Sequence, residues 1–293
     1  MTIKDALREG YSILFYAEVE TPMLDATVLL AEALSVSKEK LFASLPDEID
    51  SVSYARFKEY VDKRCRGIPV SYIRRKKEFY GLEFYVDERV LVPRPDTEVL
   101  VEEVLSLLGN NTFRAKTCPK RNPKILDLCT GSGCVAIAVK FNARDVDVYA
   151  SDITREVKDV FELNMIKILG GKKIPFFISD VFENISGKYD IITCNPPYLT
   201  DAEVENLGKL GWVEPVVALA GGRDGTEIAV RVIEEAPDYL EEGGYLMLEA
   251  APSQMTKLWA IMSARGFRDI YTRKDLGKRE RIICGRYYGK KDS

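Results

Sequence analysis

The chain has 293 residues and a net charge of −4, with 46% apolar and 30% charged residues. This composition is typical of a globular protein, and the slight negative charge disfavours nucleic acid as the main substrate. Histidine is absent, which excludes a Ser-His-Asp triad, a Cys-His pair and every metal site with a histidine ligand. A proton acceptor must therefore be a carboxylate, a tyrosine, a lysine or water.

The cysteine pattern and the hydropathy indicate a reducing compartment. No apolar run is long enough to cross a bilayer, and the first residues lead into an amphipathic pattern rather than a secretory signal. The six cysteines include no C-x-x-C pair, so they predict neither a disulfide framework nor a zinc site. We expect reduced cysteines, several of them in the core, no bound metal and a cytoplasmic protein.

Residues 1–78 are predicted to form a small helical domain, because apolar residues recur there at helical spacing. Ser37 can cap one of its helices, and Gly67 can stop the last one. No catalytic constellation occurs in this part, so the domain either docks a partner or serves as a structural cap. The expected helices cover about 3–14, 26–34, 37–42 and 53–66.

A basic run, Arg74-Arg75-Lys76-Lys77, follows the helical domain. It is interpreted as a solvated turn, with a contact to an RNA-bound or acidic partner as the alternative. Apolar segments at 79–86 and 90–92 then predict a β-hairpin that turns at 87–89. This hairpin linker, residues 79–95, is expected to join the two domains.

The helix that follows is expected to begin near Pro93-Arg94-Pro95-Asp96-Thr97-Glu98, where Asp96 or Thr97 can cap it. Capping explains the last three residues of this segment but leaves the arginine between two prolines unexplained. A polar, basic stretch at 109–123 is expected to be a loop.

From Lys124 onwards strands alternate with helices, which is typical of a parallel sheet covered on both faces. We expect residues 96–293 to form one α/β domain with a seven-stranded, mostly parallel Rossmann-like sheet, whose last two strands make a hairpin. The predicted strands are 125–128, 146–150, 174–178, 189–194, 245–249, 270–272 and 281–284. The predicted helices are 134–141, 155–169, 225–240 and 253–265, with a long insertion at 199–223.

Turns at the carboxyl ends of these strands carry the candidate site, because ligands of such sheets bind beyond that edge. Gly131 and Gly133 allow the backbone to approach a ligand, although the third glycine of the dinucleotide fingerprint is missing. Asp152 can accept both hydroxyls of a ribose, and the 180–181 pair can border an adenine ring. Asp127 is expected to order the glycine turn through backbone N–H groups.

The fourth strand ends in Asn195-Pro196-Pro197-Tyr198, which suits the alkylation of an amino nitrogen conjugated to a π-system. Such a nitrogen is a poor nucleophile. Groups that accept hydrogen bonds from its N–H groups orient it and offset the positive charge that grows on it during the attack. The Asn195 side-chain oxygen and the Pro196 carbonyl are the expected acceptors. The prolines make a stiff turn, and Tyr198 can lie against the planar group. By itself, the tetrapeptide is also typical of an ordinary turn.

Together, these strand ends fit S-adenosylmethionine, with its reactive methyl group facing Asn195. On the same residues the chain resembles the class I methyltransferases, and over nearly its whole length it is similar to the HemK/PrmC family. These are the peptide chain release factor glutamine N5-methyltransferases. The similarity lies in the motifs Pro93 to Glu98, Leu126 to Gly133, Asn195 to Tyr198, Glu214-Pro215 with Gly221 to Gly225, and Asp275 to Arg281.

The resemblance implies methyl transfer from S-adenosylmethionine to N5 of the glutamine in the Gly-Gly-Gln motif of class I release factors, with S-adenosylhomocysteine as the product. The catalytic residues are expected to be Asn195, Pro196 and Tyr198, and Pro197 joins them in binding the glutamine. The expected cofactor-binding residues are Asp127, Cys129, Thr130, Gly131, Ser132, Gly133, Asp152, Asp180, Val181 and Asn195. Cys129 replaces a usual glycine, and Val181 stands where the family has bulky aromatic residues.

Three other functions compete with this one. They are glutamine N5-methylation of a ribosomal protein, N-methylation of adenine or guanine in nucleic acid, and a non-catalytic S-adenosylmethionine-binding or scaffold role. The negative net charge argues against DNA, and the intact tetrapeptide argues against the scaffold. We expect a monomer that binds release factors and neither DNA nor a membrane.

Overall fold

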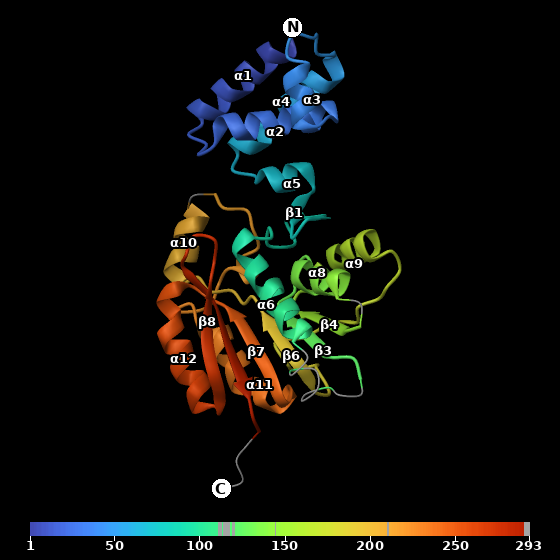
Figure 1. The fold of residues 1–293 in the computed structure, drawn as a ribbon. Coiled ribbons are helices and arrows are strands. Elements are labelled where there is room, and N and C mark those ends of the chain that lie inside the picture. The colour runs from blue at the N-terminus through green and yellow to red at the C-terminus, as the bar shows by residue number, and fades with distance from the viewer. Residues whose placement is uncertain (111–112, 114–117, 119–120, 144, 210, 290–293) are drawn as a thin grey trace. The chain divides into compact units, whose positions relative to one another are not determined.

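The computed structural model describes residues 1–293 except 111–112, 114–117, 119–120, 144, 210 and 290–293. The chain divides into two compact units (Figure 1). Unit 1 comprises Met1–Lys76 and Leu207–Val213, and unit 2 comprises Lys77–Asn206 and Glu214–Ser293. No described helix has the length and the apolar character that a membrane span requires.

Unit 1 is helical, as the apolar periodicity predicts, and its core includes the fully buried side chains of Leu14, Leu41 and Phe57. Ser37 caps its third helix, accepting the Lys40 N–H at 3.3 Å. The helices of the N-terminal segment are α1 Ile3–Tyr16, α2 Pro22–Leu34, α3 Lys38–Ala43, α4 Ser51–Cys65 and α5 Val70–Arg74.

The basic run contains the end of a helix that the sequence did not predict. Arg74 is the last residue of α5, and Arg75 is its C-cap in the left-handed conformation, with φ 55°. Arg74 Nε and Lys76 Nζ both bind Glu32 Oε2, at 3.0 and 2.8 Å. These two cations therefore serve packing within unit 1, and the interpretation of the run as a simple solvated turn is wrong.

The β-hairpin lies closer to the N-terminus than predicted. Its antiparallel strands are β1 Lys77–Phe79 and β2 Leu82–Phe84. Tyr80 and Gly81 form the turn, with φ values of 52° and 70°. Two consecutive positive φ values are what a tight two-residue hairpin turn requires, and tyrosine gives no sequence signal for that conformation. The chain does turn near 87–89, where the Val90 N–H donates to the Asp87 carbonyl at 3.1 Å, but the described residues 90–92 form no strand, so the predicted hairpin around that turn is wrong.

Unit 2 contains a seven-stranded sheet in the order β5-β4-β3-β6-β7-β9-β8 (Figure 1). Strands β5, β4, β3, β6 and β7 pair in parallel, and β9 pairs antiparallel with both β7 and β8. This confirms the predicted fold class and the terminal hairpin. The strands are β3 Lys124–Leu128, β4 Asp147–Asp152, β5 Phe176–Ile178, β6 Tyr189–Cys194, β7 Leu240–Glu249, β8 Phe267–Lys274 and β9 Glu280–Tyr287.

Each face of the sheet is covered by its own hydrophobic cluster, because successive strand residues point to opposite faces. Ile125 and Ile191 belong to the cluster that includes α6 and α8, whereas Leu126 and Ile192 belong to the cluster that includes α11 and α12. The helices are α6 Glu98–Gly109, α8 Cys134–Asn142, α9 Val157–Leu169, α10 Asp201–Lys209, α11 Glu227–Tyr239 and α12 Met255–Ala264. Short 3-10 helices lie at η1 Pro95–Thr97, η2 Val216–Ala218 and η3 Pro252–Gln254.

Most predicted helices and strands are confirmed to within a few residues, with two differences in unit 2. The insertion at 199–223 contains α10 and η2. Strand β7 begins at Leu240 rather than after a glycine turn, and Gly243 and Gly244 lie within it, next to a register shift against β6. The predicted loop at 109–123 lies largely outside the described residues.

Candidate active site

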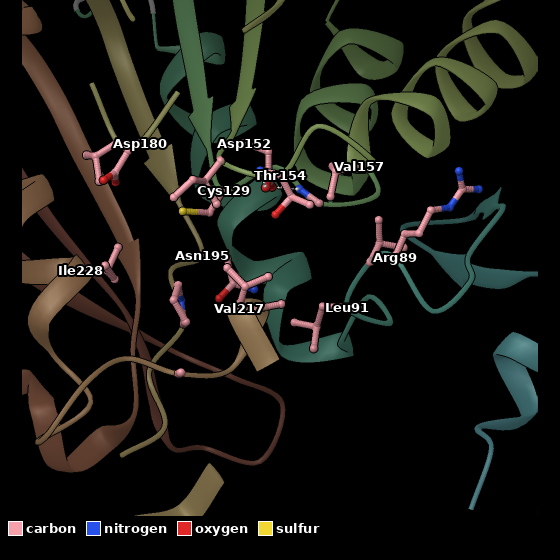
Figure 2. Close-up of a pocket in the computed structure, with 17 residues that line it drawn as sticks. Arg89, Leu91, Cys129, Asp152, Thr154, Val157, Asp180, Asn195, Val217 and Ile228 are labelled. Carbon is pink, nitrogen blue, oxygen red and sulfur yellow. Dashed lines mark hydrogen bonds between the residues drawn. The ribbon is translucent and has the colours of Figure 1, made fainter. Parts of the chain in front are cut away.

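A cavity of about 260 Å³ lies at the carboxyl edge of the sheet in unit 2 (Figure 2). Strands β4, β3 and β6 are neighbours, and the strand order reverses between β3 and β6. Ligands of such sheets bind at that reversal. The predicted site residues that line the cavity are Cys129, Gly131, Asp152, Asp180, Val181, Asn195 and Pro197. Residues that sequence reasoning missed also line it, among them Arg89, Leu91, Thr154, Val157, Val217 and Ile228.

Asp152 fixes the glycine turn to the end of β4. Its Oδ2 accepts the Gly131 N–H at 3.0 Å, and its Oδ1 accepts the Thr154 N–H at 3.1 Å. Burial raises the pKa of its carboxyl group. A Cβ on Gly133, whose φ is 81°, would come within 2.6 Å of the Phe161 ring. The turn can therefore be this tight only with glycine at that position.

Asp127 lies beneath the turn and does not line the cavity. Its carboxylate accepts hydrogen bonds from Thr130 Oγ1 at 2.6 Å and Thr193 Oγ1 at 2.8 Å. Burial raises its pKa to about 6. Asp127 thus holds the turn through the Thr130 hydroxyl and through a backbone hydrogen bond from Ala136 at the start of α8, whereas the Gly131 N–H goes to Asp152. Thr130, Ser132 and Gly133 likewise stand behind the cavity wall.

Two non-glycine residues of the cavity wall have left-handed backbone conformations. Cys129 has φ 53° and Val181 has φ 49°. A β-branched residue rarely adopts such a φ, and strain of this kind gathers at functional sites. Ser179 holds the second turn, since its Oγ donates to the Val181 carbonyl at 3.0 Å and accepts the Asn184 N–H at 2.9 Å.

Asp180 lines the cavity and forms an ion pair. Its Oδ1 accepts a hydrogen bond from Arg231 Nη1 of α11 at 3.0 Å, and both side chains are partly exposed. An exposed pair of this kind is weak. A ligand that donates a hydrogen bond to Asp180 therefore competes with only a modest interaction.

Asn195 presents its side-chain oxygen without a local partner. Its Nδ2 donates to Thr97 Oγ1 at 3.3 Å. Within the described part of the chain, no hydrogen bond reaches Asn195 Oδ1 or the Pro196 carbonyl oxygen. Both acceptors that the sequence singled out are thus available to a substrate, and the carboxamide is not consumed by neighbouring backbone.

The backbone after Asn195 is held by close packing against the segment 221–225. Gln254 Nε2 donates to the Tyr198 carbonyl at 2.9 Å and to the Gly225 carbonyl at 3.0 Å. A Cβ on Gly221 would lie 2.6 Å from the Pro197 carbonyl, and a Cβ on Gly225 would lie 2.3 Å from that of Tyr198. This contact explains why the glycine motif accompanies the tetrapeptide in the sequence.

Tyr198 lies apart from the cavity that Asn195 lines. It borders a separate cavity of about 380 Å³, together with Gln254 and Lys257. Burial raises the pKa of its hydroxyl group. The structure thus brings Asn195 and Pro197 to the first cavity and Tyr198 to the second, while Pro196 lines neither.

A buried carboxylate, Glu214, and a buried arginine, Arg281, hold the segment before α6. Glu214 accepts the Val92 N–H at 2.9 Å and a hydrogen bond from Arg94 Nη2, which accounts for the arginine between two prolines. Arg281 Nη2 binds Asp96 at 3.1 Å and Asp275 at 3.4 Å. The motif at 275–281 is therefore tied to the motif at 93–98.

The predicted cap of α6 is absent. Thr97 precedes the helix but makes no capping hydrogen bond, and Asp96 is engaged by Arg281. The Thr97 hydroxyl instead contacts Asn195, a residue 98 positions further along the chain. A partner so distant in sequence gives no local signal, so sequence reasoning assigned this threonine to the helix.

Comparisons with known proteins show the family of this chain. The sequence matches the family models described as "PrmC N-terminal domain" over residues 5–74 and "Methyltransferase small domain" over residues 109–209. It is 33% identical over 287 residues to a release factor glutamine methyltransferase of Clostridium acetobutylicum, covering 97% of this chain and 98% of that protein. It is 36% identical over 261 residues to one of Borreliella burgdorferi, covering 89% and 87%.

A solved methyltransferase structure from Pyrococcus furiosus has the same fold. It superposes with a TM-score of 0.53 at 16% identity, over 78% of this chain and 98% of that one.

Proposed function

Because this chain belongs to the release factor glutamine methyltransferase family, we propose that it methylates the Gly-Gly-Gln glutamine of class I release factors. The methyl group comes from S-adenosylmethionine and goes to the side-chain amide nitrogen, N5. The observation that carries the proposal is the place of Asn195. It lines one cavity with Gly131 and Asp152, and no described residue bonds its side-chain oxygen.

The residues around the cavity fit S-adenosylmethionine. Both Asp152 oxygens accept backbone N–H groups, and because a carboxylate can accept about four hydrogen bonds, it keeps acceptor capacity for the ribose. Val157 and Ile228 add apolar wall, and Asp180 and Val181 are assigned to the adenine. We assign Asp127, Thr130, Ser132 and Gly133 to the support of this wall. When bound, the cofactor supplies a methyl group on a positively charged sulfur.

The chain itself orients the glutamine amide. The Asn195 side-chain oxygen and the Pro196 carbonyl accept hydrogen bonds from its two N–H groups. These bonds hold the nitrogen towards the cavity and offset the positive charge that grows on it. Neither proline has an N–H that could donate to the amide. We assign Tyr198, which borders the second cavity, to pack against the part of the glutamine substrate that reaches that cavity. The alkylated amide is acidic and loses its proton to water.

The two units divide the work in this proposal. The helical N-terminal part docks the release factor, and the hairpin of β1 and β2 leads into the methyltransferase domain. The family model of the N-terminal domain covers residues 5–74, which supports a specific role for that part. We propose that the enzyme acts as a monomer in the cytoplasm on protein rather than DNA, in keeping with its net charge of −4.

The test is incubation with isotopically labelled S-adenosylmethionine and, separately, a purified class I release factor, ribosomal protein and DNA. Mass spectrometry of the peptides then locates the methyl group. A release factor with Gly-Gly-Glu in place of Gly-Gly-Gln is the matched substrate control. Label on the glutamine amide of the release factor supports the proposal, and label confined to ribosomal protein or DNA overturns it.

A further inference from the structure

One wall of the first cavity is a stretch without helix or strand, residues 85–92, which follows β2. Part of this wall segment lines the cavity together with Gly131 and Asp152, namely Arg89, Val90 and Leu91 (Figure 2). Its far end is held where the Val92 N–H donates to Glu214. Because such a segment has no ladder of its own to satisfy its backbone groups, other groups must hold its beginning as well.

Asn164 of α9 holds the beginning of the wall segment. Its Oδ1 accepts the Tyr85 N–H at 2.6 Å, and its Nδ2 donates to the Tyr85 carbonyl at 3.0 Å. The same Nδ2 donates to the Ser132 carbonyl at 2.9 Å. Ser132 belongs to the glycine turn, so a single side-chain amide joins the wall segment to that turn.

The position of Asn164 on α9 is set by helical periodicity. Val157, Phe161 and Asn164 stand at i, i+4 and i+7, so they share one face of the helix. Val157 lines the cavity, and the Phe161 ring is what a Cβ on Gly133 would meet. This face of α9 therefore supports the cavity, and Asn164 is its hydrogen-bonding member.

The chemistry of the position calls for a carboxamide. Asn164 is 0% exposed, and a buried polar group is costly unless it is hydrogen-bonded. The three bonds need one acceptor and two donors on the same side chain. A carboxamide offers both, whereas a carboxylate only accepts and an aliphatic side chain does neither. Asn164 is thus matched to the two backbone segments that it joins.

Two ion pairs also link α9 to this part of the chain, and both lie at the surface. Lys167 Nζ binds Glu83 Oε1 at 2.8 Å, and Arg89 Nη1 lies 3.5 Å from Asp159 Oδ2. Exposed ion pairs of this kind contribute little, because water and salt screen them. The buried amide of Asn164 is not screened in this way, so it is the stronger constraint on the wall segment.

We propose that Asn164 is a positioning residue for the cofactor, which fixes the wall segment against the glycine turn and so sets the shape of the cavity that S-adenosylmethionine enters. The proposal rests on the proposed function for the identity of that cofactor. Asn164 does not line the cavity, so it acts through Tyr85 and Ser132 and touches no reacting atom. Its loss should therefore weaken cofactor binding and leave the transfer step itself intact.

Two substitutions in the full-length protein test this role. Asn164→Ala removes all three bonds and leaves room for water beside the freed backbone groups, whereas Asn164→Ser keeps one hydroxyl. We expect the S-adenosylmethionine Kd, measured by calorimetry, to rise about 10-fold or more in Asn164→Ala and less in Asn164→Ser. At saturating cofactor, kcat and the KM for the release factor should stay within about 2-fold of wild type.

Met262→Ala is the matched control for a general loss of stability. Met262 is 0% exposed in the cluster on the other face of the sheet, so its truncation destabilises the fold without touching the wall segment. Its folded form should bind S-adenosylmethionine with the wild-type Kd. A rise of the same size in this control, or a wild-type Kd in Asn164→Ala, overturns the proposal. If Asn164→Ala does not fold, Asn164→Ser decides the question by the same comparison.

A second readout needs neither turnover nor cofactor and so separates this inference from the proposed function. Hydrogen exchange is followed by mass spectrometry in peptides from residues 86–91, which leave out Tyr85, the residue that loses its partner directly. We expect exchange there to accelerate in Asn164→Ala and to stay as in wild type in Met262→Ala. Unaltered exchange in Asn164→Ala overturns the positioning role even if the enzyme methylates release factors. Accelerated exchange upholds it even if another substrate is methylated.

Discussion

Replacement of Gly225 by alanine tests how the active-site turn is held. The added Cβ would lie 2.3 Å from the Tyr198 carbonyl oxygen and 2.7 Å from Gln254 Nε2. Both are far inside van der Waals contact, and the backbone oxygen cannot move without shifting the Asn195 to Tyr198 turn. Gly225 also has φ 75°, which an alanine adopts only with strain.

These two effects can be separated by a control. Gly187 has φ 84°, but a Cβ added there meets nothing within 4 Å, so Gly187→Ala carries the backbone strain alone. That strain costs about 1–2 kcal/mol. Overpacking against fixed neighbours adds about 1–3 kcal/mol, so Gly225→Ala should cost roughly 2–5 kcal/mol in total.

Urea unfolding of both variants gives the two free-energy losses, and methyl transfer gives kcat. We expect Gly225→Ala to lose more stability than Gly187→Ala and to lose kcat as well, because the clash displaces the turn that carries the acceptors. If the two variants lose the same stability and Gly225→Ala keeps wild-type kcat, the packing argument is refuted.

Three further substitutions give distinct results. Cys129→Gly removes the backbone strain of a non-glycine residue at φ 53°, so the free energy of unfolding in urea should rise or stay unchanged. A fall of more than about 1 kcal/mol would show that Cys129 is not strained there. Asp152→Asn should raise the S-adenosylmethionine Kd about 10-fold or more by calorimetry, and an unaltered Kd would remove Asp152 from the ribose site. Asp127 has its folded pKa raised from 3.8 to about 6, so its contribution to stability is present below pH 4 and is lost as pH rises to 6. This change in the free energy of unfolding is on the order of 3 kcal/mol, and Asp127→Asn should abolish it. The measurement is the free energy of unfolding of both proteins as a function of pH, and the same pH dependence in both would contradict the prediction.

The sequence predicted the sheet and its carboxyl edge because apolar runs and glycine turns are local signals. Cys129, Gly131, Asp152 and Asn195 each follow or end such a run, and parallel pairing then brings them together. The assignment of the four turns to one edge therefore needed no knowledge of distant contacts.

The wrong predictions concern which of several similar residues makes a given contact, and tertiary structure decides that. Asp127 and Asp152 are both carboxylates near the turn, and only the pairing of Asp127 with Ala150 puts Asp152 within reach of Gly131. Thr97 has the sequence context of a helix cap, but its hydroxyl reaches Asn195 on a strand far along the chain. Asn164 is one more polar residue of a predicted helix and becomes notable only when it is found buried between two backbone segments.

The most direct test of the central claim is turnover by Asn195→Ala with a class I release factor, measured beside cofactor binding. The account predicts a fall in kcat of about 10²-fold or more, while S-adenosylmethionine still binds. Turnover close to that of the wild-type enzyme would contradict the claim that the Asn195 side-chain oxygen holds the substrate amide.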